Sequence, residues 1–187
     1  MKINIENIHF KNALVSCLQA YDIDFKENGN FLKTTVTMND VKTHKIQNID
    51  QNSGLFLKDM YLMLYFLNEE NHTIISCSLD DIVLIDKHYF FINPEKIIKC
   101  DEETFTLEYP ISLDEFSPPE LHYMEELPQS LPNQTIFYSL ACILYYFITH
   151  KVYKKTSDLN IMYYSPLYYC LKRMLYLNPQ HRKFLYI

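Results

Sequence analysis

Glycine and tryptophan are the scarcest residues of this 187-residue chain, which contains two glycines, Gly29 and Gly54, and no tryptophan. Two isolated glycines cannot build a G-x-G-x-x-G loop, which excludes the glycine-rich cover that many enzymes place over nucleotide phosphates. No C-x-x-C pair occurs, and the seven histidines never fall in an H-x-x-x-H pattern. The sequence therefore predicts no metal centre and no disulfide framework. It predicts reduced core thiols at five scattered positions, Cys17, Cys77, Cys100, Cys142 and Cys170.

Positive charge is also in deficit, with 17 Lys and Arg against 23 Asp and Glu and a net charge of −6. A nucleic-acid binder carries a basic face, and an anionic membrane attracts basic segments, so we expect neither nucleic acid nor membrane as a partner. The opening residues, MKINIENIHF, lack the apolar run of a signal peptide, which favours a cytoplasmic protein. Apolar residues make up 48%, which predicts a single folded domain over residues 1–187.

The most apolar stretch is TIFYSLACILYYFIT, residues 135–149, which contains no charged residue. A helix that is apolar on every side is buried in a protein or in a membrane. A membrane span needs about 20 such residues, and this run is shorter. We therefore expect it to form the central buried helix of the fold.

Hydrophobic spacing and turn residues predict the remaining elements. Helices are expected over residues 6–18 and 54–68, and from Ser165-Pro166 to about residue 177. Strands are expected at 21–25, 31–38, 82–85, 89–92, 97–98 and 104–107. The five prolines between residues 110 and 132 predict an extended loop with one helical turn after Pro119, and residues 150–164 form a second loop. This is an α+β chain that is mainly helical.

The order of these elements, together with three short motifs, resembles the protein-kinase fold. The segment Phe116-Ser117-Pro118-Pro119-Glu120 is similar to the A-P-E end of an activation segment. Tyr138-Ser139-Leu140-Ala141 is similar to the W-S-L-G of helix F. The ending LKRMLYLNPQHRKFLYI resembles the family's terminal pattern, in which an arginine follows a helix and a proline. It is also similar to kinase-like proteins encoded by large DNA viruses.

The resemblance begins part-way into the small lobe, so it implies a fold like the kinase C-lobe with a truncated N-lobe. The first three strands would be missing, and with them the phosphate-binding lysine. Residues 1–40 would be the residual small lobe, with helix C at 6–18, a hairpin at 20–38 and the hinge at 37–40. Residues 41–187 would be the large lobe.

The resemblance also implies structural roles for three residues. In the family, the glutamate of A-P-E pairs with the late arginine, and the matching positions here are Glu120 and Arg182. Ser139 is the serine of the helix-F motif. We expect the Glu120–Arg182 pair to be buried and bidentate; the alternative is that the two are unrelated surface charges.

The positions that would carry kinase chemistry are degenerate. Ser76 lies where H-R-D is expected, and no aspartate occurs between residues 73 and 79. Asp81 takes the place of the metal-binding asparagine, and Asn93 takes the place of the D-F-G aspartate. Ile136 replaces the usual aspartate of helix F. Because phosphoryl transfer needs these groups together, the sequence predicts no catalytic residue, no metal and no cofactor.

Two other chemistries can be weighed from the residues alone. Asp80, Asp81 and Asp86 are close in sequence, but adjacent strand residues diverge, so solvated loop acids are favoured over a metal site. Cys77 near His72 or His88 would suggest a nucleophile, but nothing in the sequence fixes that geometry. A buried, inert thiol is the favoured interpretation.

These predictions favour a catalytically inactive kinase-like protein that binds a protein partner, as a scaffold, regulator or assembly component. The resemblance implies a viral origin, with a location in the host cytoplasm or in a viral particle. One alternative is an atypical active kinase or nucleotide binder that uses Asp81 and Asn93. A second alternative is a structural virion protein. Three tyrosine pairs are candidate interface anchors, unless helix packing buries them: Tyr145-Tyr146, Tyr163-Tyr164 and Tyr168-Tyr169.

Overall fold

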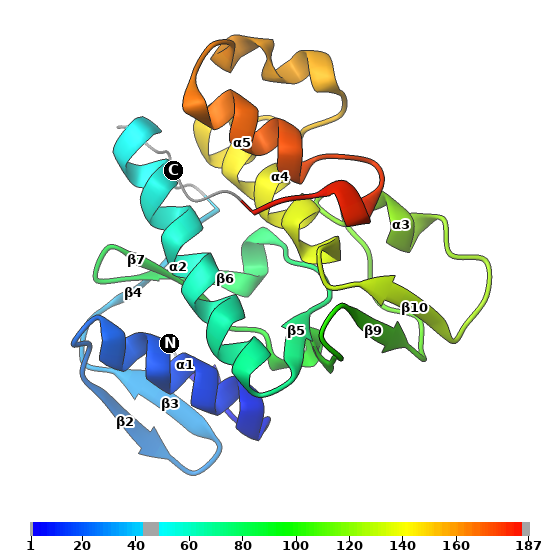
Figure 1. Ribbon diagram of the computed structural model, residues 1–187. Coiled ribbons are helices and arrows are strands. Elements are labelled where there is room, and N and C mark those ends of the chain that lie inside the picture. The colour runs from blue at the N-terminus through cyan, green and yellow to red at the C-terminus, as the bar shows by residue number, and fades with distance from the viewer. Residues whose placement is uncertain (1, 43–48, 185–187) are drawn as a thin grey trace.

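The computed structural model describes residues 2–42 and 49–184, and it shows small antiparallel sheets around a helical body (Figure 1). The central helix, α4 (Thr135–Thr149), is buried along most of its length, as its lack of charge predicts. His150 ends α4 in the left-handed conformation, with φ 54°, and donates its N–H to the carbonyl of Tyr146 at 2.7 Å. Helices α2 (Ile49–Glu69) and α5 (Pro166–Met174) contact α4. The predicted α+β class and the central helix are confirmed.

The N-terminal part combines one helix with a small sheet. Its elements are β1 (Ile3–Asn4), α1 (Ile8–Ala20), β2 (Phe25–Asn28) and β3 (Phe31–Thr34), with strand order β1-β3-β2. Asn7 caps α1 by accepting the N–H of Phe10 at 3.0 Å. The strand predicted at 21–25 is wrong by about four residues, because the chain first turns off the end of α1 through Asp22, whose φ is 54°. Gly29, with φ 58°, makes the predicted hairpin turn.

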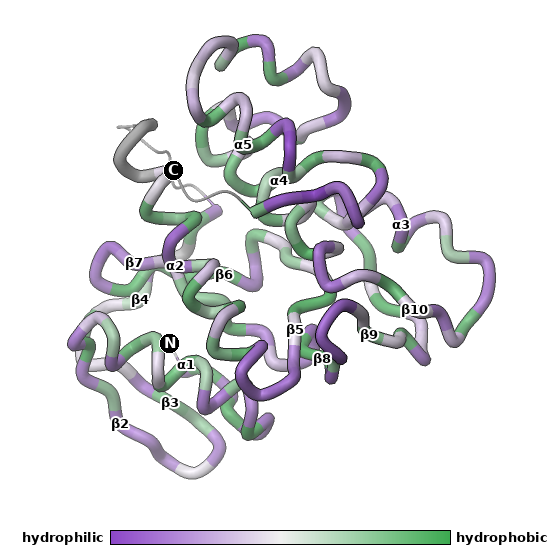
Figure 2. The backbone as a smooth tube through the Cα atoms, in the orientation of Figure 1, coloured by the Kyte–Doolittle hydropathy of each residue, from purple (hydrophilic) through white to green (hydrophobic). Residues whose placement is uncertain are grey.

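The second sheet lies against α2. It has the order β4-β6-β7 and consists of β4 (Met38–Asp40), β6 (Ile82–Ile85) and β7 (His88–Phe91). The hairpin predicted around residues 86–88 is confirmed, and Figure 2 shows its hydrophilic turn. The strand predicted at 31–38 is wrong at its end, because β3 stops at Thr34 and β4 pairs with β6 instead. Phe56 of α2 packs edge-on against Tyr89 of β7 at 5.2 Å between ring centroids.

Two short two-stranded sheets lie beyond the end of α2. One pairs β5 (His72–Ile74) with β8 (Ile97–Lys99), and the other pairs β9 (Thr104–Leu107) with β10 (Gln129–Pro132). The sequence predicted β8 and β9 but neither of their partners. β10 lies within the proline-rich segment that was predicted to be a loop, and the helical turn predicted after Pro119 is α3 (Pro119–His122).

The C-terminal part packs on α4. The 3₁₀ helix η3 (Thr156–Met162) occupies the stretch predicted as a loop, and α5 ends at Met174, three residues before the predicted end. Ser165 caps α5 by accepting the N–H of Tyr168 at 3.1 Å, and Pro166 stands at its first position. A last turn, η4 (Pro179–His181), follows Asn178. Among residues 2–42 and 49–184, no helix combines the length and apolar composition needed to cross a membrane.

Candidate functional site

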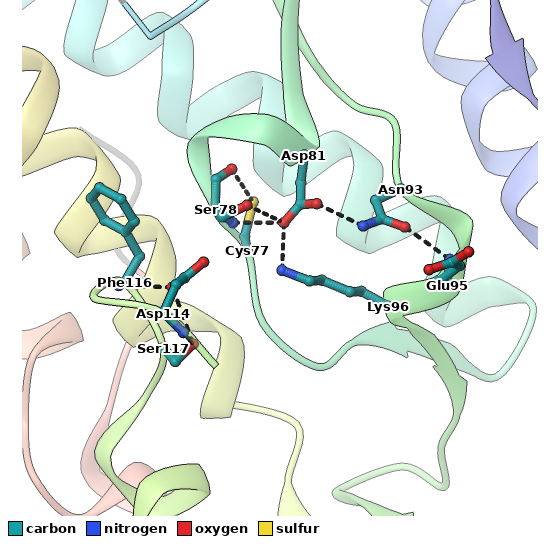
Figure 3. Close-up of polar contacts among 9 residues, drawn as sticks. All are labelled: Cys77, Ser78, Asp81, Asn93, Glu95, Lys96, Asp114, Phe116 and Ser117. Atoms are coloured by element: carbon teal, nitrogen blue, oxygen red, sulfur yellow. Dashed lines mark hydrogen bonds and ion pairs between the residues drawn. The ribbon is translucent and has the colours of Figure 1, made fainter. Parts of the chain in front are cut away.

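The carboxylate of Asp81 is the centre of a polar cluster, and Asp81 lies in the chain segment that connects β5 to β6 (Figure 3). Asp81 is the last residue of a 3₁₀ turn, η1 (Leu79–Asp81), which begins after Ser78. Its side chain folds back onto the start of this turn, where Oδ2 accepts the N–H of Ser78 at 2.7 Å and its hydroxyl at 2.8 Å. These local hydrogen bonds fix the carboxylate in one orientation.

Asn93 and Lys96 approach Asp81 from the segment after β7. Asn93 caps a second 3₁₀ turn, η2 (Pro94–Lys96), by accepting the N–H of Glu95 at 3.1 Å. This turn places the amide nitrogen of Asn93 at 2.7 Å from Asp81 Oδ1. It also places Lys96 Nζ at 2.7 Å from Asp81 Oδ2. The structure therefore brings together the two predicted positions, Asp81 and Asn93, and adds a lysine that the sequence analysis did not single out.

The Asp81–Lys96 pair is largely withdrawn from solvent, with side-chain exposures of 4% and 19%. Both carboxylate oxygens are engaged, so Asp81 already holds a cation that belongs to the chain itself. A second cation would have to displace the ammonium group. Breaking a buried ion pair from one side typically costs about 3–5 kcal/mol, because the remaining charge is left without a partner.

The neighbouring residues Ser76 and Cys77 offer no activated nucleophile. Both are buried, and the hydroxyl of Ser76 has no hydrogen-bond partner among the described residues. Burial raises the pKa of the Cys77 thiol well above its ordinary value, and the negative charges of Asp81 and Asp114 raise this pKa further. The predicted burial of Cys77 is confirmed, and a thiol held protonated is a weak nucleophile, which favours the inert interpretation.

Asp114 is a second acid near this cluster that the sequence analysis missed. Its carboxylate accepts the N–H of Phe116 at 2.9 Å and the hydroxyl of Ser117 at 3.1 Å, which forms a tight turn in the proline-rich segment. The Asp-x-x-Ser spacing is a turn signal that was available in the sequence. Its proximity to Cys77 was not, because 37 residues separate the two.

The acids Asp80, Asp81 and Asp86 do not converge. Asp80 is exposed and pairs with Lys42, whereas Asp81 points inward, and Asp86 is exposed in the β6–β7 turn with φ 46°. Asp80 and Asp86 are thus the solvated acids that the sequence predicted, but that prediction is wrong for Asp81, which is buried. Within residues 2–42 and 49–184, no group of three His, Cys, Asp or Glu residues is arranged to hold a metal ion.

The predicted pair of Glu120 and Arg182 is present. Glu120 lies in the first turn of α3, and Arg182 follows η4. Arg182 Nη1 donates to Glu120 Oε1 at 2.5 Å, and Nη2 donates to Oε2 at 2.8 Å, with side-chain exposures of 0% for the arginine and 12% for the glutamate. The bidentate, buried geometry is therefore confirmed, and the alternative of two unrelated surface charges is wrong.

Two other predicted positions lie on α4 near this pair. Ile136 is buried where an acid was expected by resemblance, and it contributes to the apolar core. Ser139 is fully buried, and its hydroxyl makes no hydrogen bond to a described residue. Ser139 therefore contributes small size to the packing of α4 and no polar contact.

Asp59 is a buried acid that the sequence analysis also missed, because it lies within the apolar pattern of α2. It accepts hydrogen bonds from the hydroxyl of Tyr21 at 2.6 Å and the N–H of Tyr89 at 2.8 Å, and it lies 3.2 Å from Nδ1 of His88. Burial raises the pKa of Asp59, although these three partners act to lower it. This network ties α1 and β7 to α2.

The tyrosine pairs separate into buried and exposed members. Tyr145 is buried in α4, and Tyr146 packs edge-on against Phe116 at 5.8 Å. Four residues at the η3–α5 junction instead form an exposed group that we call the tyrosine patch: Ile161, Tyr163, Tyr164 and Tyr169. Ring contacts link its tyrosines, either directly, as between Tyr163 and Tyr164 at 4.3 Å, or through Tyr168.

Comparison of the chain with protein-family models and with curated proteins gave no match. The function is therefore argued from the geometry of the chain's own residues. That geometry offers a neutralised acidic site, a buried structural ion pair and an exposed aromatic surface.

Proposed function

We propose that this chain is a catalytically inactive, kinase-like protein of viral origin that binds a protein partner as a scaffold, regulator or assembly component. The observation that carries the proposal is the Lys96 ammonium group, which is bound to Asp81 beside Asn93. The order of the motifs and the Glu120–Arg182 pair support the kinase-like fold.

The loss of catalysis follows from how this polar cluster is filled. Phosphoryl transfer uses Mg²⁺, held by an aspartate and an asparagine, to neutralise the phosphates. Here Lys96 supplies the positive charge at Asp81, and the side-chain oxygen of Asn93 is occupied by the N–H of Glu95. No aspartate is available between residues 73 and 79 to accept a substrate proton. An internal ammonium group in this position keeps the fold's local structure without its metal.

Binding to a protein partner is supported by the tyrosine patch. Ile161 is 75% exposed and Tyr164 is 81% exposed. Burying such apolar and aromatic side chains lowers the free energy, so a partner that covered them would bind more tightly. Tyrosine is enriched at protein interfaces, because its large, rigid ring loses little conformational entropy on binding. The tyrosine patch is therefore the surface that we propose for contact with a protein partner.

An atypical nucleotide binder remains the second candidate, and one observation favours it. The amide nitrogen of Asn93 lies 2.7 Å from Asp81 Oδ1, so the two residues are adjacent. They would both present an oxygen to a cation if Lys96 moved away and the Asn93 amide turned over, which breaks its bond from Glu95. A partner would then have to supply the missing lysine. The two candidates differ in whether ATP and Mg²⁺ bind to the isolated chain.

The test of inactivity is thermal unfolding with and without ATP and Mg²⁺. A ligand present at 100 times its dissociation constant stabilises a protein by about 2.7 kcal/mol, which shifts the melting temperature by several degrees. We expect no shift and no transfer of labelled γ-phosphate to a substrate. Either a shift or a transfer would overturn the proposal in favour of the second candidate.

The test of partner binding uses variants of the tyrosine patch. A double variant, Ile161→Ser with Tyr164→Ser, should lose a partner that the wild-type chain captures from cells producing it. Tyr123→Ser is the matched control, because Tyr123 is also 81% exposed but lies outside the patch, after α3. Equal capture by all three proteins would remove the patch from the proposal.

A further inference from the structure

The strands β8 and β9 follow one another in the chain but pair with each other at a single position. Their connection closes at an antiparallel bridge between Cys100 and Phe105, and the N–H of Asp101 donates to the carbonyl of Thr104 at 2.8 Å. Beyond the bridge the two strands part, since β8 pairs with β5 and β9 pairs with β10. A cavity of about 630 Å³ lies there and is lined by both strands.

Backbone groups of both strands face this cleft. The N–H of Cys100 donates to the carbonyl of Asn71, so the even-numbered residues of β8 direct their backbone N–H and C=O groups toward β5. Residues 97 and 99 therefore point theirs away from β5, because successive residues alternate along a strand. The same reasoning applies to β9. The backbone carbonyl of Glu103 accepts the N–H of Asn133, so the backbone N–H and C=O groups of residues 106 and 108 point away from β10. Two strand edges border one cavity, and on the β8 edge the N–H of Ile97 already donates to the carbonyl of Pro94.

The floor of the cleft is apolar and belongs to a small second core. Six residues form this core, separate from the main one: Ile75, Cys100, Phe105, Leu107, Leu121 and Leu131. Ile98 and Ile111 pack against it, remain partly exposed and line the cavity. An added strand with apolar side chains on one face would cover them.

The negative charge around the cleft favours a ligand of positive charge. Residues 100–150 contain nine Asp or Glu and neither Lys nor Arg, so they carry a formal charge of −9, whereas the rest of the chain, with 14 acidic and 17 basic residues, carries +3. Three acids and one base line the cavity itself, namely Glu95, Asp101, Glu108 and Lys99. Figure 2 shows the hydrophilic turn that joins β8 to β9 at this point.

We infer that the β8–β9 cleft binds an extended, cationic segment of a partner polypeptide, which adds as a strand between the two edges. This inference rests on the proposed protein-binding function and adds a second surface with a stated partner chemistry. Strand edges supply backbone hydrogen bonds, which select a polypeptide in extended form. The acidic rim selects Lys and Arg on the outward face of that strand, and the apolar floor selects aliphatic residues on the inward face.

The probe is a synthetic peptide of alternating lysine and valine, about eight residues long, which would extend roughly 26 Å as a strand. Two control peptides have glutamate in place of lysine, or proline in place of alternate valines. We expect the lysine–valine peptide to bind the full chain and both controls to fail. The glutamate peptide is repelled by the acidic rim, and the proline peptide lacks some of the N–H groups that a strand donates to its neighbour. Binding of the glutamate peptide with similar affinity would overturn the inference.

Two charge-reversal variants locate the binding. Glu108→Lys alters the rim of the cleft and should weaken peptide binding by about tenfold, as expected for reversing a charge near a cationic ligand. Glu126→Lys makes the same charge change in the same acidic segment, but Glu126 does not line the cavity, so affinity should change by less than about twofold. Hydrogen exchange should slow at the backbone amide of Glu108 when the peptide is bound.

The outcomes separate this inference from the proposed function. If no cationic peptide binds, or if both variants weaken binding equally, or if the amide of Glu108 stays unprotected, the strand-addition site is wrong. The proposed function still stands in that case when the wild-type chain captures a partner that the tyrosine-patch variant loses. If ATP and Mg²⁺ stabilise the isolated chain, the proposed function is wrong whatever the peptides do.

Discussion

Arg182 binds Glu120 through two parallel hydrogen bonds and directs its other N–H groups to three backbone carbonyls. Nε donates to Tyr176 at 2.7 Å, Nη1 donates to Thr135 and Nη2 donates to Leu177, both at 3.2 Å. All five donors of the guanidinium group are thereby satisfied inside the protein. One side chain joins α3, the start of α4 and the chain after α5.

Replacement of Glu120 by alanine should destabilise the protein strongly, because it leaves the buried Arg182 charge without its counter-ion. We expect a loss of about 3–5 kcal/mol in the free energy of unfolding, measured by urea denaturation. Glu125→Ala is the control, since Glu125 is exposed a few residues further along the chain and should change stability by less than about 0.5 kcal/mol. Equal, small effects in both variants would show that the pair contributes little.

The ion pair between Lys96 and Asp81 should show strong energetic coupling. Lys96→Met alone leaves a buried carboxylate without its counter-ion and should lower the free energy of unfolding by about 3–5 kcal/mol. Lys96→Met combined with Asp81→Asn removes both charges, so the double variant should lose less stability than the sum of the two single changes. Urea denaturation of the four proteins gives the coupling energy. Lys99→Met is the matched control, because Lys99 is exposed on β8. Additive effects would contradict the role of Lys96 as the internal cation.

Local patterns predicted most of the helices and the two hairpins β2–β3 and β6–β7, because those elements carry their signals within a few residues. The uncharged run of α4 and the β6–β7 turn needed no distant partner to be recognised. β5 and β10 were missed for the opposite reason. β10 contains a proline and lies within a proline-rich segment, and it forms a strand because β9, more than twenty residues earlier, supplies its hydrogen bonds.

The candidate site was predictable to the same extent. The motif order identified Glu120 and Arg182 as partners across 62 residues, and the structure joins them. Asp81 and Asn93 were singled out as replaced metal positions, but nothing in the sequence showed that Lys96 would reach Asp81. That contact depends on the η2 turn, in which Asn93 and Pro94 direct the chain back toward η1. A turn of three residues thus decides the chemistry of the cluster.

The five thiols should be unreactive in the folded protein, since all five cysteines are buried. Burial raises the pKa of Cys17 to about 12, with a further contribution from Asp59, and it also raises the pKa of Cys142 to about 12. A chromogenic disulfide reagent at slightly alkaline pH should therefore react slowly with native protein and rapidly with all five thiols in guanidinium chloride. Fast reaction of one thiol in the native state would identify a local opening near that residue.

Asp59 should make stability depend on pH in the direction opposite to that of most carboxylates. Burial raises its pKa above the ordinary value of 3.8, so the folded protein binds the proton of Asp59 more tightly than the unfolded chain does. The contribution of this group to stability is fully present below pH 3.8 and is lost as the pH rises through the raised value. Asp59→Asn removes the titrating group, so the stability of this variant relative to the wild type should increase as the pH rises over the same interval. Urea denaturation of both proteins at a series of pH values measures the difference. A difference that stays constant or decreases with pH would show that the hydrogen bonds from Tyr21, Tyr89 and His88 outweigh burial and hold the carboxylate ionised in the folded state.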